Sequence, residues 1–269
     1  MKIRYFYPNF KKKVFILSYD DGVTDDKDFI KILNELGFKA TFNLNTELMR
    51  NEFVWYNDRG DEIKRLPLEI IDDLYEGHEI ASHSSTHPYL DNMSDEEIYE
   101  NIAKDLENIP FLQGFATPFT YFHPRLKDIV SSLGFSYLRC SIMSESYERY
   151  HYYYEIKPTV FHLDNKLDKL LNGFFIAKEE LATFMLVGHT YDLRVHNCYD
   201  KIIDVLKTIK NHDDIINLTT IETVNYLKAI DSLEITKKEI NNPSPISLYL
   251  SVDDEMIVLH PFSRYILDK

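Results

Sequence analysis

Cysteine is scarce in this sequence, which contains only Cys140 and Cys198. Two cysteines are too few for a disulfide-stabilised scaffold, and neither has a neighbour at metal-ligand spacing, so we expect reduced, buried thiols. Long apolar runs are also lacking, and no stretch approaches the roughly 18 residues that would span a bilayer. Residues 1–13 contain no apolar segment followed by a small-residue cleavage site. We therefore expect a cytoplasmic protein with no membrane partner, or a secreted one if a leader has been removed.

Positive charge is the second deficit. The chain has 30 lysines and arginines against 44 aspartates and glutamates, which gives a formal net charge of −14. A negative summed field repels phosphate groups, so nucleic acids and anionic membrane surfaces are unfavourable partners. Residues 11–13 form the only obvious basic run, and we interpret them as solvated. With 269 residues, 44% of them apolar, the chain can bury a sizeable core in one large α/β domain or two small ones.

The pattern that is present is an alternation of short apolar runs with amphipathic stretches, which is typical of βα units. We expect helix ends near Gly37 and Gly77, and a capping box that joins Ser94 to Glu97 at the start of another helix. The expected strands are residues 14–17, 40–44, 78–82, 114–117, 136–141, 183–187 and 215–218. The expected helices are residues 29–36, 67–74, 94–108, 124–133 and 196–210.

About seven strand–helix repeats in series predict a parallel α/β barrel, complete or incomplete, and an open doubly wound sheet fits the same pattern. The pattern changes after residue 230, where a loop at 241–245 precedes two alternating runs on either side of residues 253–255. We therefore expect a barrel over residues 1–230 and a small C-terminal β-hairpin extension over residues 231–269 that packs on the barrel.

Two segments do not fit the alternation. Residues 45–66 form a long connection that carries the only tryptophan, Trp55, and residues 147–154 are dense in tyrosine. Long loops in compact domains are often functional lids, and sugar rings stack on aromatic faces. The simpler interpretation, which we favour for both segments, is that their aromatic side chains pack each loop onto its own domain.

Two adjacent aspartates, Asp20 and Asp21, follow the first expected strand and precede Gly22. In a parallel α/β fold, active-site groups collect at the carboxyl ends of the strands. Adjacent carboxylates repel each other unless a cation lies beside them, although Asp-Asp-Gly alone is also an ordinary turn. His189 ends a late apolar strand in the same way, and it is either catalytic or an ordinary structural histidine.

His83 and His87 follow the third expected strand. Two histidines four residues apart face the same side if the backbone makes one helical turn, and Pro88 should end that turn. An H-x3-H pair occurs often by chance. Together with one carboxylate, however, it gives an Asp/His/His set that suits Zn²⁺ or a similar divalent ion and leaves positions for water and substrate.

Four motifs occur in order: Ser-Tyr-Asp-Asp-Gly at 18–22, Ala-Thr-Phe-Asn at 40–43, His-Ser-Ser-Thr-His at 83–87 and Leu-Val-Gly-His at 186–189. In these motifs and their spacing the chain resembles the polysaccharide deacetylase, or NodB-homology, family, of the carbohydrate esterase family 4 type. The resemblance covers about residues 14–193. It implies an α/β fold in the form of a deformed (β/α) barrel of about seven parallel strands, which the strand count independently allows.

The resemblance also implies a role for each motif residue. Asp20 would be the general base. Asp21, His83 and His87 would hold one divalent metal, with Zn²⁺ as the first expectation and Co²⁺, Ni²⁺ or Mn²⁺ as alternatives. His189 would be the general acid that protonates the leaving amine. The metal would polarise the substrate carbonyl and lower the pKa of its bound water, so that one carboxylate and one imidazole divide the base and acid work.

The third family motif departs from its usual form, Arg-x-Pro-aromatic-Gly. Ala116 stands in place of the arginine that holds the base aspartate, and Thr120 stands in place of the glycine. Pro118 and the aromatic Phe119 are kept. The resemblance therefore implies that a backbone N–H after Pro118, most simply that of Phe119, holds the tetrahedral oxyanion together with the metal.

Two hypotheses address what the motifs lack. The first is that Arg139, at the end of a neighbouring expected strand, supplies the missing cation to Asp20. The family also tends to orient its acid histidine with an aspartate on the strand after the third motif, and this sequence has none there. The second hypothesis is that Glu145 or Asp192 orients the histidine instead, with neither as the alternative.

The leading functional hypothesis is a metal-dependent hydrolase that removes an acetyl group from an N-acetylated sugar or polysaccharide, and thus cleaves a C–N bond that is not a peptide bond. A second hypothesis keeps the machinery and changes the substrate to an O-acetyl ester or a non-sugar amide. A third is a non-catalytic carbohydrate-binding protein that retains the scaffold. The lack of a secretion signal favours an intracellular biosynthetic intermediate over cell-wall polymer as the substrate.

Overall fold

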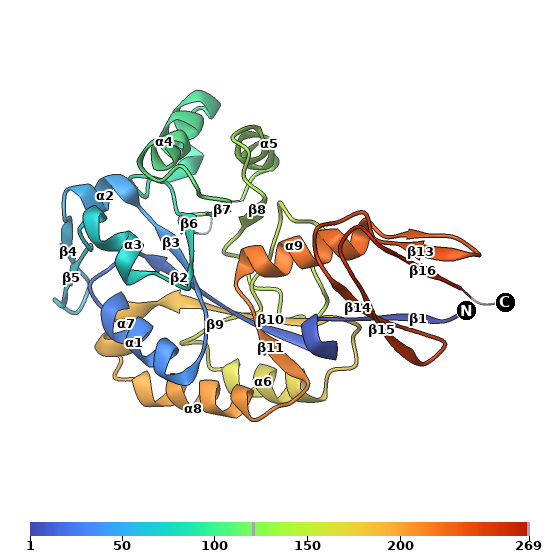
Figure 1. Ribbon diagram of the computed structural model, residues 1–269. Coiled ribbons are helices and arrows are strands. Elements are labelled where there is room, and N and C mark those ends of the chain that lie inside the picture. The colour runs from blue at the N-terminus through green and yellow to red at the C-terminus, as the bar shows by residue number, and fades with distance from the viewer. Residues whose placement is uncertain (120–121, 268–269) are drawn as a thin grey trace.

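The computed structural model describes residues 1–119 and 122–267, so Thr120 lies outside the described residues. Its centre is a parallel sheet with the order β8-β7-β6-β3-β2-β10-β9, and β11 pairs with β2 beside this path. With its flanking helices the sheet forms a deformed α/β barrel, as predicted (Figure 1). The strands are β2 (Lys13–Asp21), β3 (Thr41–Leu44), β6 (Glu79–Ser82), β7 (Gly114–Ala116), β8 (Tyr137–Arg139), β9 (Val160–Phe161), β10 (Ala182–His189) and β11 (Ile215–Asn217).

Strand β2 lies in the middle of the sheet and leads directly to the two aspartates. All nine of its residues are buried, and β3, β10 and β11 pair with it in parallel. An uninterrupted apolar run is typical of a strand whose two faces are both covered. The strand is longer than predicted and ends at Asp21, because Asp20 and Asp21 keep their register with β3, and Asp20 also pairs with His189 of β10.

Helices lie on both sides of the sheet, with α4 and α5 on one side and α1, α6 and α8 on the other (Figure 1). As predicted, α1 ends at Gly37, which has a φ of +76°, and α4 begins with a capping box between Ser94 and Glu97. The segment predicted as one helix from Pro67 is a 3-10 turn followed by the single turn α3. The helices are α1 (Asp26–Leu36), α2 (Thr46–Arg50), α3 (Ile71–Leu74), α4 (Asp95–Asn108), α5 (Pro124–Ser132), α6 (Leu167–Ile176), α7 (Thr190–Val195), α8 (Tyr199–Lys210) and α9 (Thr220–Asp231), with 3-10 turns η1 (Pro8–Phe10), η2 (Leu68–Ile70) and η3 (Leu90–Asn92).

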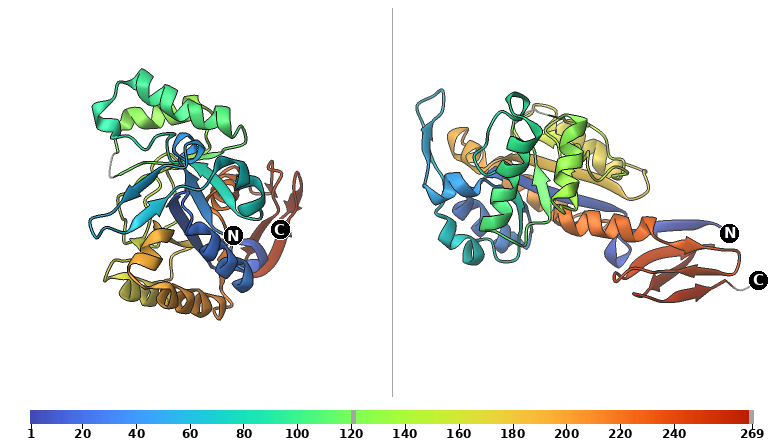
Figure 2. Two further views of the ribbon diagram at one scale, coloured as in Figure 1. Left: turned by 90° about the vertical axis from the view of Figure 1, so that its left-hand side faces the viewer. Right: turned by 90° about the horizontal axis from the view of Figure 1, so that it is seen from above.

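The residues after α9 contribute to two small antiparallel sheets that project from one end of the barrel (Figure 2). The predicted hairpin is present as β14 (Leu248–Val252) and β15 (Glu255–Leu259). The N-terminal strand β1 (Ile3–Phe6) pairs with β14, which the sequence did not predict. The second sheet contains β12 (Glu234–Ile235), β13 (Glu239–Asn241) and β16 (Arg264–Ile266).

Tyr226 of α9 connects this extension to the barrel. Its hydroxyl donates a hydrogen bond to Phe6 O at 2.5 Å and accepts one from Tyr249 N at 3.1 Å. The boundary predicted between residues 230 and 231 falls at the end of α9, and its division of the chain into two domains stays a prediction. In the described part of the chain, no helix combines the length and apolarity needed to cross a bilayer.

The two irregular segments have different structures. Residues 45–66 fold into α2 and an antiparallel hairpin of β4 (Val54–Tyr56) and β5 (Glu62–Lys64). In the tyrosine-rich segment, the ring of Tyr147 packs 5.9 Å from that of Phe174, and its hydroxyl donates to Leu170 O at 2.8 Å. Tyr147 therefore packs its loop onto the domain, as the simpler interpretation predicts.

Candidate active site

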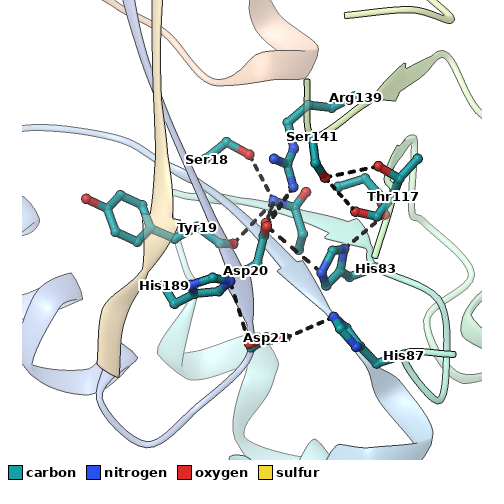
Figure 3. Close-up of polar contacts among 12 residues, drawn as sticks. Ser18, Tyr19, Asp20, Asp21, His83, His87, Thr117, Arg139, Ser141 and His189 are labelled. Atoms are coloured by element: carbon teal, nitrogen blue, oxygen red, sulfur yellow. Dashed lines mark hydrogen bonds and ion pairs between the residues drawn. The ribbon is translucent and has the colours of Figure 1, made fainter. Parts of the chain in front are cut away.

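A cavity of about 700 Å³ lies at the carboxyl ends of the parallel strands, where the chemically important residues of the motifs meet (Figure 3). This volume is within the range of small-molecule sites. Aspartate, histidine and arginine side chains form its polar centre. Aromatic side chains form much of its wall: Phe53, Trp55, Phe119, Phe161 and Tyr191. The cavity therefore joins a charged centre to apolar walls.

The backbone around the cavity is strained at several positions. Positive φ angles occur at the non-glycine residues Asp21 (94°), Ser84 (62°), His87 (49°) and Phe119 (55°). Such angles are uncommon for residues with a Cβ and persist only where the surrounding structure imposes them. At these four positions the fold therefore holds the side chains in set directions.

Asp21, His83 and His87 form a cluster suited to a metal, with one ligand atom from each residue within 4.8 Å of the others. His83 Nδ1 lies 2.9 Å from Ala116 O, which leaves Nε2 free to face the cluster. Asp21 Oδ1 is buried and has no hydrogen-bond partner among the described residues. One carboxylate and two imidazoles fit a divalent ion such as Zn²⁺, although Arg65 Nη1 also lies 3.0 Å from Asp21 Oδ1.

Burial keeps the two histidines of this cluster neutral, which is the form that binds metals. Burial lowers the pKa of His83, and burial together with the nearby His83 lowers the pKa of His87 to about 4. The loop that carries them is held by Asn45, whose Nδ2 donates to His83 O at 2.6 Å and Ser84 O at 2.7 Å. The His-x3-His loop is therefore fixed from its backbone as well as from its rings.

Asp20 lies beside this cluster and is held by Arg139, as the sequence hypothesis predicts. Arg139 Nη2 lies 2.7 Å from Asp20 Oδ1 and 2.8 Å from Oδ2, and Asn43 Nδ2 donates to Oδ1 at 2.7 Å. Burial alone would raise the pKa of Asp20, but the Arg139 guanidinium and the neighbouring histidines bring it below its ordinary value. Asp20 is thus an ionised carboxylate next to the three candidate metal ligands, and its catalytic role stays a prediction.

His189 contacts Asp192 rather than Glu145. His189 Nδ1 lies 3.0 Å from Asp192 Oδ2, whereas Glu145 pairs with Lys166 at 2.5 Å. Burial lowers the pKa of His189, but the Asp192 hydrogen bond and the charge of Asp21 raise it above its ordinary value overall. The imidazole therefore holds a proton more readily than an ordinary histidine, with its Nε2 4.0 Å from Asp21 Oδ2.

His162 is a site neighbour that the sequence did not predict. It is fully buried, its Nε2 lies 3.4 Å from Asp192 Oδ2, and its Nδ1 lies 3.3 Å from Tyr19 Oη. A Cβ at Gly188 would lie 2.5 Å from His162 Nδ1, so this position of β10 requires glycine. His162 and His189 thus share the Asp192 carboxylate. The sequence gave no signal for this contact, because His162 is a lone histidine with no neighbouring motif.

Arg65 reaches the site without a sequence signal that predicted it, and Trp55 lines the cavity too, which agrees with the functional interpretation of residues 45–66 that we did not favour from the sequence. Arg65 Nη1 lies 3.0 Å from Asp21 Oδ1, and the guanidinium lies over the Trp55 ring at 4.7 Å. Burial would raise the pKa of Asp21, but Arg65 and the site histidines lower it. Trp55 meets Tyr191 edge-on at 5.8 Å, and Tyr191 stacks on His189 at 5.0 Å. The β4–β5 hairpin therefore forms one wall of the site.

Phe119 forms a different part of the wall. Its ring stacks on Tyr89 with centroids 3.9 Å apart and meets His87 edge-on at 4.5 Å. The structure thus places Phe119 at the cavity, next to Pro118, whereas the proposed use of its N–H as an oxyanion donor stays a prediction. Together, an ionised carboxylate, a readily protonated imidazole and a set of residues suited to a metal have the chemistry for hydrolysis by general base and acid.

Comparisons with known proteins agree with this geometry. Residues 7–138 match the family model for polysaccharide deacetylase. No curated protein matches the chain.

Several solved structures share the fold. A candidate polysaccharide deacetylase from Mycobacterium smegmatis aligns with a TM-score of 0.61 at 14% identity, over 84% of this chain and 93% of its own. The family 4 carbohydrate esterase domain of a xylanase from the hindgut metagenome of Trinervitermes trinervoides gives 0.51 at 19%, over 81% and 92%. A pseudoenzyme of the same esterase family from Bacillus anthracis gives 0.50 at 20%, over 82% and 68%. At these identities the alignments show a common fold and leave the activity open.

Proposed function

Since this chain carries a polysaccharide deacetylase domain, we propose that it is a metal-dependent hydrolase that removes an acetyl group from an N-acetylated sugar. The observation that carries the proposal is the ionised Asp20, held by Arg139, next to the Asp21–His83–His87 cluster. A carbohydrate-binding protein would need neither an arginine-paired buried carboxylate nor an open set of metal ligands.

Asp21, His83 and His87 would hold the divalent metal, with Zn²⁺ expected first and Co²⁺, Ni²⁺ and Mn²⁺ as alternatives. When bound, such an ion polarises a carbonyl oxygen and lowers the pKa of water. The protein's part is to keep these ligands unprotonated and correctly aimed. The low pKa of His87, about 4, and the bond of His83 to Ala116 O serve this purpose.

Asp20 would act as the general base, taking a proton from the attacking water at a carboxylate oxygen. Arg139 and Asn43 hold that carboxylate from the side, and Arg139 keeps it ionised near neutral pH. In the proposed mechanism Arg139 thus does the work of the arginine that the third motif lacks.

His189 would act as the general acid and donate a proton to the leaving nitrogen. Its bond to Asp192 orients the ring and favours the protonated form that this role requires. The backbone N–H of Phe119 is the proposed donor to the oxyanion. The aromatic side chains Trp55 and Phe119 in the cavity wall offer faces on which a sugar ring can stack.

The same residues could act on an O-acetyl ester or a non-sugar amide. One observation favours keeping this alternative, namely that aliphatic side chains such as Leu48, Met143 and Val187 also line the cavity. Such a wall suits any acyl compound with an apolar face. Activity assays on both classes therefore belong to the same test.

The test begins with metal content. We expect about one equivalent of Zn, Co, Ni or Mn in the purified wild type, and loss of it in an Asp21→Asn, His87→Ala double variant. Acetate release is then measured from N-acetylated sugars and from O-acetylated xylan. A wild type without metal, even after reloading and dialysis, would exclude the hydrolase and favour a carbohydrate-binding protein.

A further inference from the structure

The buried Arg65 lies beside a proposed metal ligand, where the resemblance to known enzymes assigns no residue. Its side chain is 4% exposed, and Nη1 lies 3.0 Å from Asp21 Oδ1. The same nitrogen donates a hydrogen bond to Asp21 O. His87 Nε2 lies 3.7 Å from that same Oδ1, on which the cation and the second histidine therefore converge.

The surrounding structure fixes Arg65 in this position. Its backbone N donates to Phe53 O at 2.9 Å, and the next residue, Leu66, donates to Gly22 O at 2.9 Å. The Trp55 ring lies against the guanidinium with 4.7 Å between Cζ and the ring centroid. Arg65 is thus a built part of the wall and not a surface side chain that happens to lie nearby.

The two neighbouring aspartates therefore have one arginine each. Arg139 holds Asp20, the proposed base, and Arg65 holds Asp21, the proposed metal ligand. A cation beside the base is useful because it keeps the carboxylate ionised. A cation beside a metal ligand instead impairs the ligand's function, because it repels the metal and competes for the same oxygen. This repulsion is strong where water is excluded.

We propose that Arg65 is a positioning residue that lowers the affinity of the Asp21–His83–His87 site for its divalent metal by sharing the Asp21 carboxylate. The inference rests on the proposed function, because it assumes that these three residues bind a metal. A neutral outer-shell donor orients a ligand without repelling the ion. A fixed guanidinium both orients and repels, so the metal is held more loosely than the three ligands alone would hold it.

The test is a Zn²⁺ titration of the full-length protein in competition with a chromophoric chelator. Arg65→Met and Arg65→Gln remove the charge with different shapes, and Arg65→Lys keeps it. Arg50→Met is the matched control, because Arg50 is half-exposed and pairs with Glu47 outside the site. Circular dichroism and thermal melts establish that each variant is folded.

We expect both neutral variants to bind Zn²⁺ at least about tenfold more tightly than the wild type, the size of effect that outer-shell partners have. Arg65→Lys and Arg50→Met should stay close to the wild type. Equal or weaker binding by the neutral variants would overturn the inference, and so would an equal gain in Arg65→Lys. Absence of Zn²⁺ binding from every protein, the wild type included, would overturn the proposed function as well.

Discussion

At the scale of single residues, the site shows how two adjacent, identical side chains acquire different chemistry. Asp20 and Asp21 differ in the cations that they face: Arg139 contacts both oxygens of Asp20, and Arg65 contacts one oxygen of Asp21. Asp20 also accepts from Asn43, whereas Asp21 Oδ1 has the Arg65 ion pair but no hydrogen-bond partner in the described parts of the chain. Environment rather than residue type therefore separates the proposed base from the proposed ligand.

The first prediction separates these two roles. Asp20→Asn should keep the metal and lose at least about 100-fold in kcat, because a general base contributes that much or more. His83→Ala should lose both metal and activity, since it removes a proposed ligand. Metal analysis and acetate release on the same preparations would measure both effects. Near-normal turnover by Asp20→Asn would show that another group is the base.

The second prediction concerns Arg139 and the acid limb of the pH–rate profile. Arg139 lowers the pKa of Asp20, so Arg139→Met should raise it. The base is active when ionised, and the acid limb of kcat/KM should therefore move to higher pH while bound metal is unchanged. Arg139→Lys should restore part of the shift. An acid limb that does not move in Arg139→Met would mean that Arg139 has only a structural role.

At the scale of elements, α4 supports the metal-binding loop through its polar face. Asp105 accepts hydrogen bonds from Ser82 Oγ at 2.5 Å and Thr46 Oγ1 at 2.6 Å. One turn earlier on the helix, Asn101 accepts from Ser85 N at 3.0 Å. These bonds join α4 to the residues on either side of His83, so the helix fixes the start of the loop.

The third prediction compares two changes in this helix. Ser94→Ala removes the capping box and should cost about 1 kcal/mol of stability without affecting metal affinity. Asp105→Ala should cost about 1–3 kcal/mol, because the buried Ser82 and Thr46 hydroxyls lose their partner, and it should also weaken metal binding. Urea unfolding and Zn²⁺ titration measure the two effects. Equal losses of metal affinity in both variants would mean that helix stability alone matters.

Element prediction from the sequence succeeded where one element has a regular apolar pattern and a clear cap. The helix that ends at Gly37 and the helix that begins at Ser94 are examples. It failed for α6, where Gly173 interrupts the helical pattern. A Cβ at Gly173 would lie 2.2 Å from Tyr147 Oη. The glycine is therefore required by close packing against a ring that is distant in the sequence, and not by the conformation of its own helix. Strand β9 has only two residues, too few to show any period.

The site was predictable to the extent that its residues lie in motifs or at strand ends. Arg139 could be placed beside Asp20 because it ends the strand that follows the third motif. Arg65 and His162 could not be placed, since the strands that they directly follow, β5 and β9, have only three and two residues and show no pattern in the sequence. Their partners, Asp21 and Asp192, are 44 and 30 residues away along the chain. Such contacts depend on loop paths that no local pattern determines.

At the scale of the whole molecule, the barrel separates the site from the extension. The β4–β5 hairpin that walls the cavity and the β14–β15 sheet lie at opposite ends in Figure 1. No residue of the extension lines the cavity in the described parts of the chain. The extension is instead attached through Tyr226, Phe6 and Tyr249. The described lining of the cavity thus comes from the barrel and its loops.

A second property of the whole molecule is a set of three buried carboxyls outside the cavity, in different parts of the barrel. Burial raises the pKa of Asp26, Glu79 and Asp105 to about 7 in each case. Each accepts hydrogen bonds from neighbouring hydroxyls: Asp26 from Tyr75 at 2.5 Å, and Glu79 from Tyr137 at 2.7 Å. These acids bind protons in the folded protein that the unfolded chain releases above about pH 4.

The last prediction follows from this linkage. A carboxyl whose folded pKa is raised contributes stability below its unfolded pKa and loses that contribution as pH rises to the folded value. The contribution of these three carboxyls to the unfolding free energy should therefore fall between about pH 4 and pH 7, and urea unfolding of wild type and variant across that range isolates it. Glu79→Gln should flatten the fall by on the order of 1–3 kcal/mol, because one of the three titrations is gone. Glu76→Gln, the same change at an exposed position three residues earlier, is the control. Equal pH dependence in the two variants would mean that Glu79 is ionised in the folded protein, and that its hydroxyl partners stabilise a charge rather than a neutral acid.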